Sequence, residues 1–287
     1  MNKVKFAVFT DLHYDHIYDG EERIEQFVAS VKDRQLDFVI QLGDFAYPIP
    51  ENQKLIDKLK TLGVPFYGVI GNHDTDRYAK EDVLRFLGLE NSYYAFCMGN
   101  IKFIVLDTCF VKTEQFYPYV PEPVVRWLED ELDDDAQYYV LFSHHSMTND
   151  FANRGVINRD EIQACIAAAK RKDKKVLLYM NGHDHGEDIT QIEDTVYYAL
   201  NSMSYIWVGP AYEQFSYAAH IHQKYPYLKD LILYRDGLFT IVTVDEGGHF
   251  TIEGLQSDYQ RMSPQVLNLG ETWNGRSIKP SVTTFSK

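Results

Sequence analysis

Five apolar runs of the length of a β-strand each end in a short group of aspartate, asparagine or histidine residues. The runs span residues 4–10, 38–42, 64–70, 138–142 and 175–180. The polar residues that follow them are Asp11 and His13; Asp44; Asn72, His73 and Asp74; His144 and His145; and His183 and His185. In open α/β sheets, ligands bind at the edge formed by the carboxyl ends of the strands. Because six of the ten histidines lie at these ends, the pattern predicts one shared site.

The order of the runs indicates the fold class. Two amphipathic helical patterns separate the first three runs, which favours parallel strands joined by right-handed crossovers. Helices are expected over residues 21–34, 51–61, 80–87, 123–132 and 160–170. Short strands over residues 189–192, 196–200, 239–244 and 250–253 indicate a second, more antiparallel sheet packed against the first. We therefore predict an α/β (α+β) fold.

The carboxyl-terminal third contains an aromatic-rich insertion and a polar end. The insertion, residues 205–234, includes Trp207, Tyr212, Phe215, Tyr217, Tyr225 and Tyr227. These rings are candidates for ordinary core, for a lid, or for a stacking platform for a nucleobase. The sequence has no internal repeat and no linker that separates two domains. We expect one domain over residues 1–255 and an extended tail over residues 256–287, packed on or beside that domain.

The composition excludes several classes of partner. The chain has 28 basic and 42 acidic residues, a net charge of −14, and would repel a nucleic acid polymer. Its three cysteines are too few and too scattered for a disulfide framework or a thiolate zinc site. The chain starts directly in a strand pattern without a signal peptide, and no run approaches the ~20 apolar residues of a membrane span. We expect a soluble, cytoplasmic protein that does not contact membranes.

The residue types at the strand ends suit divalent metal ions. Carboxylate, imidazole and amide oxygen together favour borderline ions such as Mn, Fe or Zn. One ion takes three or four protein ligands, whereas seven candidates are present. Two ions that share a bridging carboxylate fit this number better. Such pairs, ~3.5–4 Å apart, clamp a phosphoryl group and lower the pKa of a water between them.

The order of the motifs resembles that of the calcineurin-like metallophosphoesterases of the bacterial phosphodiesterase or phosphohydrolase type. The motifs are Asp-x-His, Gly-Asp, Gly-Asn-His-Asp, His and Gly-His-x-His, and they span residues 11–185. The resemblance implies two packed mixed β-sheets flanked by helices, an αββα sandwich. It also implies two metal sites. The first site would use Asp11, His13, Asp44 and His185, and the second Asp44, Asn72, His144 and His183, with Asp44 as the bridge.

By the same resemblance, His73 is not a ligand. It would contact the phosphate and donate a proton to the leaving alkoxide, while Asp74 would hold its imidazole in the useful tautomer. Side chains alternate along a strand, so only one of His144 and His145 is expected to face the metals. The resemblance to family members in which the first histidine of such a pair is the ligand favours His144. Tyr47 matches a tyrosine that ligates ferric iron in purple acid phosphatases, but the presence of His13 favours packing or an indirect role. His145, Tyr47 and Arg154 are candidate substrate contacts.

The predicted function is that of a dinuclear metal-dependent phosphoesterase. A metal-bridging hydroxide would attack the phosphorus of a small phosphodiester, a nucleotide or a pyrophosphate-linked substrate. The alternatives are a phosphomonoesterase, a phosphoprotein phosphatase, and a non-catalytic scaffold that keeps the fold for partner binding. The sequence leaves open the oligomeric state and the identity of the two ions.

Overall fold

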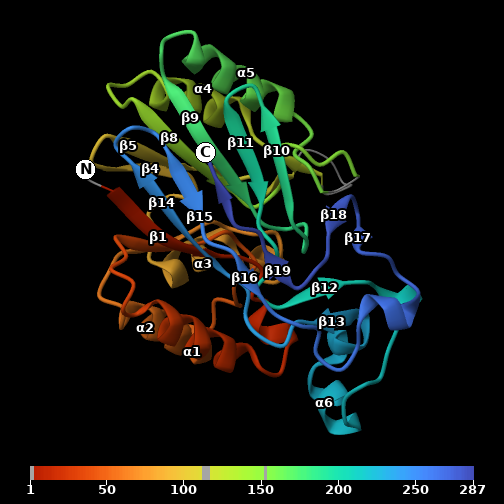
Figure 1. Cartoon of the computed structure of the whole chain (residues 1–287). Coiled ribbons are helices and arrows are strands. Elements are labelled where there is room, and N and C mark those ends of the chain that lie inside the picture. Colours follow the sequence, from red (N-terminus) through yellow and green to blue (C-terminus); the bar gives the residue numbers. More distant parts are fainter. Residues whose placement is uncertain (1–2, 112–116, 152–153) are drawn as a thin grey trace.

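Two six-stranded mixed sheets pack face to face and are covered by helices on their outer sides (Figure 1). The computed structural model describes residues 3–111, 117–151 and 154–287. In spatial order, the first sheet contains β20 (Phe285–Ser286), β15 (Phe250–Ile252), β14 (Thr240–Asp245), β1 (Lys3–Phe9), β2 (Phe38–Gln41) and β3 (Phe66–Gly68). The second contains β10 (Asp188–Ile192), β11 (Thr195–Ala199), β9 (Lys175–Asn181), β8 (Tyr138–Ser143), β5 (Ile101–Val105) and β4 (Tyr94–Met98). The predicted fold class is confirmed.

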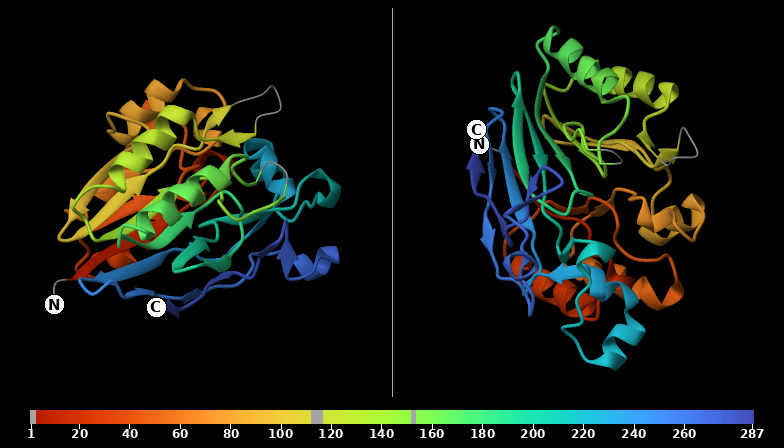
Figure 2. Two further views of the ribbon diagram at one scale, coloured as in Figure 1. Left: turned by 90° about the horizontal axis from the view of Figure 1, so that it is seen from above. Right: turned by 90° about the vertical axis from the view of Figure 1, so that its right-hand side faces the viewer.

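Helices cover the two outer faces of this sandwich (Figure 2). The first sheet is covered by α1 (Gly20–Val31), α2 (Gln53–Lys60) and α3 (Lys80–Leu87). The second is covered by α4 (Glu122–Glu131) and α5 (Arg159–Lys170). All five lie within a few residues of the helices that the apolar periodicity predicts. In α1, Ile24, Phe27 and Val31 recur on one face and are buried against the sheet.

Because side chains alternate along a strand, β1 contributes to two separate hydrophobic cores. In β1, Phe6 and Val8 point into the space between the sheets, whereas Ala7 and Phe9 pack under the helices. The ring of Phe6 stacks on Phe38 at 4.6 Å between centroids and meets Phe103 of the second sheet edge-on at 5.5 Å. These aromatic contacts fix the two sheets against each other.

The predicted parallel pairing of the first three runs is confirmed, since β2 pairs parallel with both β1 and β3. The predicted second sheet is confirmed, but the four strands expected to form it do not lie in one sheet. They divide between the two sheets, because β10 and β11 join β9, while β14 pairs with β1 and carries β15. The hairpins β10–β11 and β14–β15 each add antiparallel strands to one of the two sheets. The prediction failed because the position of a hairpin in the sequence does not show which sheet it joins.

Short two-stranded sheets lie outside the two large sheets. They pair β12 (Tyr205–Trp207) with β13 (Leu231–Leu233), β16 (Leu255–Gln256) with β19 (Ser281–Val282), β17 (Thr272–Trp273) with β18 (Arg276–Ser277), and β6 (Phe110–Val111) with β7 (Pro118–Tyr119). The connection between β12 and β13 includes α6 (Ala219–Lys224).

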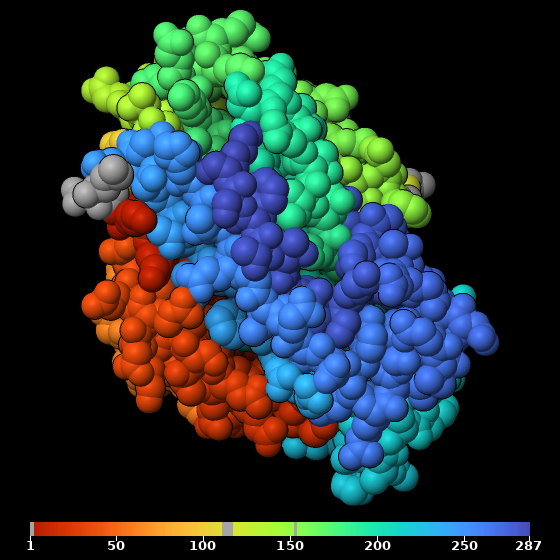
Figure 3. Space-filling model, viewed as in Figure 1, coloured from red at the N-terminus to blue at the C-terminus, as the bar shows by residue number. Residues whose placement is uncertain are grey.

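The carboxyl-terminal segment runs over the surface of the sandwich and contacts both sheets (Figure 3). Its last strand, β20, pairs with β15 at the edge of the first sheet, and Thr283 bonds to Glu187, next to β10. Ile278 and Val282 are buried in the core between the sheets. Among the residues that the structure describes, no helix combines the length and apolar character needed to cross a membrane.

Candidate metal centre

The candidate ligands lie in loops that begin where β1, β2, β3, β8 and β9 end. Five of them adopt a left-handed backbone conformation with positive φ: Asp11 (52°), His13 (47°), Asp44 (53°), His183 (66°) and His185 (49°). This conformation is unfavourable for residues other than glycine and persists where the surrounding structure enforces it, commonly at functional sites. The loops are therefore held in the shape that aims these side chains inward.

Two glycines of the motifs let the loops approach closely. A Cβ atom on Gly71 would lie 2.2 Å from Oδ1 of Asp44. A Cβ atom on Gly182 would lie 2.0 Å from Oγ1 of Thr10 and 2.7 Å from Oδ2 of Asp11. Any side chain at these two positions would displace the carboxylates that the site needs.

The first cluster joins Asp11, His13 and His185. The Nε2 atoms of the two histidines lie 3.1 Å apart, and Nε2 of His185 lies 3.4 Å from Oδ1 of Asp11. That Oδ1 atom is buried and has no hydrogen-bond partner. The other oxygen, Oδ2, accepts hydrogen bonds from the Thr10 hydroxyl and from the backbone N–H of His183. A buried carboxylate oxygen without a partner is costly unless a cation binds it.

The second cluster lies around His144. Its Nε2 atom is 3.1 Å from Oδ1 of Asn72, 3.3 Å from Nδ1 of His183 and 3.2 Å from Oδ2 of Asp44. Two ligands bonded at about 2.0–2.1 Å to one ion lie roughly 3.0–3.4 Å apart. Most separations within the two clusters fall close to that range, and the longest in the first, from Nε2 of His13 to Oδ1 of Asp11, is 3.8 Å. Each cluster therefore fits one metal ion.

Asp44 lies between the two clusters. Its Oδ2 atom is 3.4 Å from Nε2 of His13 on one side and 3.2 Å from Nε2 of His144 on the other. Its Oδ1 atom accepts a hydrogen bond from the backbone N–H of His73. This is the placement expected of a carboxylate that bridges two ions.

Backbone carbonyls orient two of the histidines. Nδ1 of His144 lies 2.8 Å from the Leu42 carbonyl oxygen, and Nδ1 of His185 lies 2.9 Å from that of Tyr205. Since a carbonyl only accepts, both Nδ1 atoms carry the proton and donate it. The Nε2 atoms face the clusters and are the atoms that would bind a metal, as is typical of histidine ligands.

The electrostatics of the metal-free site suit cations. Burial lowers the pKa of His13, His145 and His183 well below the ordinary histidine value, so these imidazoles are neutral. For His144, burial acts in the same direction, but the Asp44 carboxylate raises its pKa to about 9. Burial would raise the pKa of Asp44, yet His144 holds it well below its usual range. A metal ion would replace the proton that His144 and Asp44 now share as a pair.

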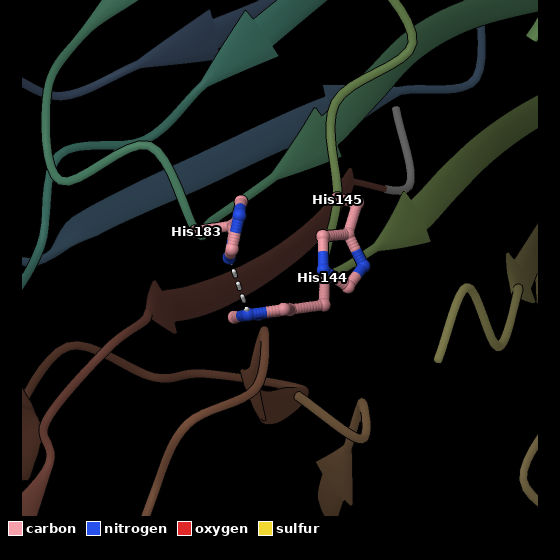
Figure 4. Close-up of side chains that lie close together, drawn as sticks. All are labelled: His144, His145 and His183. Atoms are coloured by element: carbon pink, nitrogen blue, oxygen red, sulfur yellow. Dashed lines mark hydrogen bonds between the residues drawn. The ribbon is translucent and has the colours of Figure 1, made fainter. Parts of the chain in front are cut away.

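The expectation that only one of His144 and His145 faces the site is wrong. The side chain of His145 lies close enough to those of His144 and His183 for all three to hold one ion. Its ring centroid lies 4.3 Å from that of His183 (Figure 4). Strand β8 ends at Ser143, so strand alternation does not extend to the two histidines. Nδ1 of His145 lies 2.9 Å from the Thr108 hydroxyl, whereas His144 and His183 point toward each other. His144 remains the better placed ligand, because it alone of the pair contacts Asp44.

The predicted partner of His73 is also wrong. Nδ1 of His73 lies 2.5 Å from Oδ2 of Asp76, three residues further along the chain. The carboxylate of Asp74 instead accepts hydrogen bonds from the backbone N–H groups of Gly71, Asp44 and Phe45. Asp74 therefore ties two ligand loops together, and Asp76 orients the imidazole. Burial lowers the pKa of His73, but Asp44 and Asp76 raise it to about 9.

The remaining sequence candidates lie at the edge of the site. The Tyr47 hydroxyl bonds to Nε2 of His16 at 3.1 Å, and the ring lines a small cavity with His13 and His73. Arg154 donates from Nη1 to the carbonyl oxygen of His183 at 3.0 Å. It also lines a cavity of about 350 Å³ over the clusters, together with His73.

Three further residues shape the site and are not among those predicted from the sequence. The ring of Tyr205 packs against the imidazoles of His13 and His185, with centroids 5.2 Å and 4.7 Å away. Thr108 bonds to His145. Arg276, in β18, is buried and bonds to Asp184, the residue between two ligands. Their signals were absent from the sequence, since none lies at the end of one of the five apolar runs.

Comparisons with known proteins bear on the family and the fold. A family model described as calcineurin-like phosphoesterase matches residues 4–187. The crystal structure of a dimetal phosphatase from Danio rerio is similar, with a TM-score of 0.64 and 14% identity, covering 90% of this chain and 96% of that one. GAP50, described as the anchor in the inner membrane complex of Plasmodium, has a TM-score of 0.59 and 17% identity, covering 88% and 84%.

At these identities the two structures show a shared fold. Comparison with curated protein sequences finds no match. The family model covers more than half of the chain, and the clusters around Asp44 supply the residues for two divalent ions. The chain therefore belongs to the calcineurin-like phosphoesterase family and is a hydrolase of phosphate esters.

Proposed function

We propose that this protein is a dinuclear metal-dependent phosphoesterase that prefers small phosphodiesters, including nucleotides and pyrophosphate-linked compounds. The two ions, Mn, Fe or Zn by their donor set, would be held by Asp11, His13, Asp44 and His185, and by Asp44, Asn72, His144 and His183. When bound, the ions supply Lewis acidity toward the phosphoryl oxygens and activate water.

The protein side chains would bind the substrate and move protons. Arg154 and His73 line the same cavity over the clusters, where both can contact phosphate oxygens. With its pKa at about 9, His73 is protonated at neutral pH in the metal-free protein. Because Asp76 holds Nδ1, the proton on Nε2 is the one available to the leaving alkoxide.

The preference for diesters is supported by two cavities that meet at the clusters. The first, of about 350 Å³, is lined by His73, Arg154, His183 and Trp207, among others. The second, of about 530 Å³, is lined by Asn72, Asp76, Phe110, His145 and again His183. A phosphodiester carries two substituents on one phosphorus, and each cavity can take one of them. A monoester would need only one cavity.

We also propose that the protein is cytoplasmic and does not act on nucleic acid polymers. A net charge of −14 disfavours a nucleic acid polymer as substrate, whereas a small phosphate ester can enter a site neutralised by two ions. The three cysteines are free, which accords with the reducing conditions of the cytoplasm. The oligomeric state is left open.

The test compares bis(p-nitrophenyl) phosphate with p-nitrophenyl phosphate as substrates of the Mn²⁺-loaded protein. We expect a higher kcat/KM for the diester, and a loss of activity in both the Asp44→Asn and His73→Ala variants. A variant of the exposed Arg235, which lies in another part of the chain, should retain full activity. A higher kcat/KM for the monoester would refute the diester preference, and equal activity in all variants would refute the enzyme assignment at this site.

A further inference from the structure

We propose that Trp207 and Tyr227 form a subsite for a nucleobase next to the metal centre, so that the preferred substrates are nucleotides or their esters. This inference rests on the proposed phosphoesterase function and names the class of its substrate. It assigns a role to the aromatic insertion beyond ordinary packing.

Strand β12 places Trp207 beside the clusters. Tyr205 and Trp207 are two residues apart on this strand, and their side chains point to the same face. Ile206 between them points the other way, into the core between the sheets. Since Tyr205 packs on the candidate ligands His13 and His185, Trp207 continues the same aromatic surface outward from the metal centre.

The indole of Trp207 borders open space. It is partly exposed, whereas Tyr205 is buried, and both line the 350 Å³ cavity that contains His73 and Arg154. A cavity of this size lies at the lower end of the range of about 300–1,000 Å³ that holds small ligands. The cavity therefore offers an aromatic wall on one part of its surface and phosphate-binding groups on another.

A second ring lies beside Trp207. The ring centroids of Trp207 and Tyr227 are 6.0 Å apart, and Tyr227 is 36% exposed. Tyr227 also lies 4.6 Å from the ring of His16, which lies 6.0 Å from that of His73. Ring contacts thus run from His73 through His16 and Tyr227 to Trp207, which lines the cavity. Exposed rings beside a phosphate site are the chemistry that recognises a planar base carrying a phosphate.

The direct test is equilibrium binding, which does not depend on turnover. Adenosine monophosphate and ribose 5-phosphate share the sugar phosphate and differ in the base. Both are titrated by calorimetry into the Mn²⁺-loaded His73→Ala protein, in which hydrolysis is slowed. We expect the nucleotide to bind roughly 5- to 150-fold more tightly, the range that stacking on one aromatic side chain provides.

Variants separate recognition from folding. Adding Trp207→Ala should remove most of the difference between the two ligands, and Trp207→Phe should retain most of it. Trp127→Ala is the matched control, because Trp127 is also partly exposed but packs on Tyr93 in the helix layer outside the second sheet. This control should leave the ratio of the two affinities unchanged.

Two results would overturn the subsite. One is equal affinity for adenosine monophosphate and ribose 5-phosphate in the protein with Trp207 intact. The other is a Trp207→Ala variant that weakens both ligands by the same factor, which is the behaviour of a residue that only supports the fold. Failure to hydrolyse p-nitrophenyl esters would instead refute the proposed function and leave the binding result to decide the subsite.

Discussion

Replacing Arg276 tests whether the carboxyl-terminal segment is part of the metal centre. The side chain of Arg276 is 7% exposed, and its Nε atom lies 2.8 Å from Oδ2 of Asp184. It also contacts Asp188 at 3.1 Å, the hydroxyl of Ser146 at 3.2 Å and that of Thr148 at 3.3 Å. One guanidinium therefore joins the loop after β9 to the loop after β8, and these two loops carry His183 and His144.

The expected cost of Arg276→Met follows from these contacts. Removing one partner of a buried ion pair costs about 3–5 kcal/mol, because the other charge stays buried without compensation. At about 2–4 °C per kcal/mol for a chain of a few hundred residues, the midpoint of thermal unfolding should fall by roughly 6–20 °C. Metal affinity should fall about 10- to 100-fold, the usual effect of losing support for a ligand loop.

The cost should depend on pH. Burial already raises the pKa of Asp184, while Arg276 lowers it, so the variant raises that pKa further. A carboxyl group with a raised pKa in the folded state destabilises the fold above its unfolded pKa and ceases to do so when protonated in both states. The loss in Arg276→Met should therefore be smallest in acid and grow as the pH rises above the unfolded-state pKa of Asp184. Adding Asp184→Asn should recover part of the stability at neutral pH.

Thermal unfolding measured by circular dichroism checks these values. The control is Arg235→Met, since Arg235 is 58% exposed and pairs with Asp258 and Asp236 on the surface. Exposed ion pairs contribute about 0–1 kcal/mol, so this variant should unfold close to the parent temperature. Equal effects of the two methionine variants would refute the assignment of Arg276 to the support of the site.

Three further predictions concern the site itself. Asp76→Asn removes a group that raises the pKa of His73, so the basic limb of the pH–rate profile should move to lower pH; an unchanged limb would contradict the pairing. Metal uptake by the metal-free protein should release a proton, because His144 has a pKa of about 9, and metal affinity should rise between pH 7 and pH 9. Calorimetry in buffers of different ionisation enthalpy measures the proton release, and metal uptake without it would contradict the prediction. His145→Ala should retain two ions with about 10- to 100-fold weaker binding, whereas loss of an ion would make His145 a ligand.

The strand ends were predictable because buried strands and ligand groups leave local signals. An apolar run followed by aspartate or histidine marks both the strand and its functional end, as for Asp11 after β1 and His183 after β9. The order of the five groups indicated the family. Parallel crossovers place the groups at one edge of the fold.

The details that failed depend on local geometry beyond the strands. Residues 73–75 form a 3₁₀ turn, in which residues three apart lie on one side, so Asp76 rather than Asp74 meets His73. His145 reaches the site because β8 ends one residue before His144. Arg276 is separated by 92 residues from Asp184, and only the path of the carboxyl-terminal segment brings the two together.

We propose that Asp44 joins two metal ions at the meeting point of the loops. Electron paramagnetic resonance during titration of the metal-free protein with Mn²⁺ tests it directly. We predict two ions per chain, with a spectrum of an exchange-coupled pair as expected for ions ~3.5–4 Å apart, and loss of the coupling in Asp44→Asn. A single ion per chain, or two ions without coupling in the parent protein, would contradict the account.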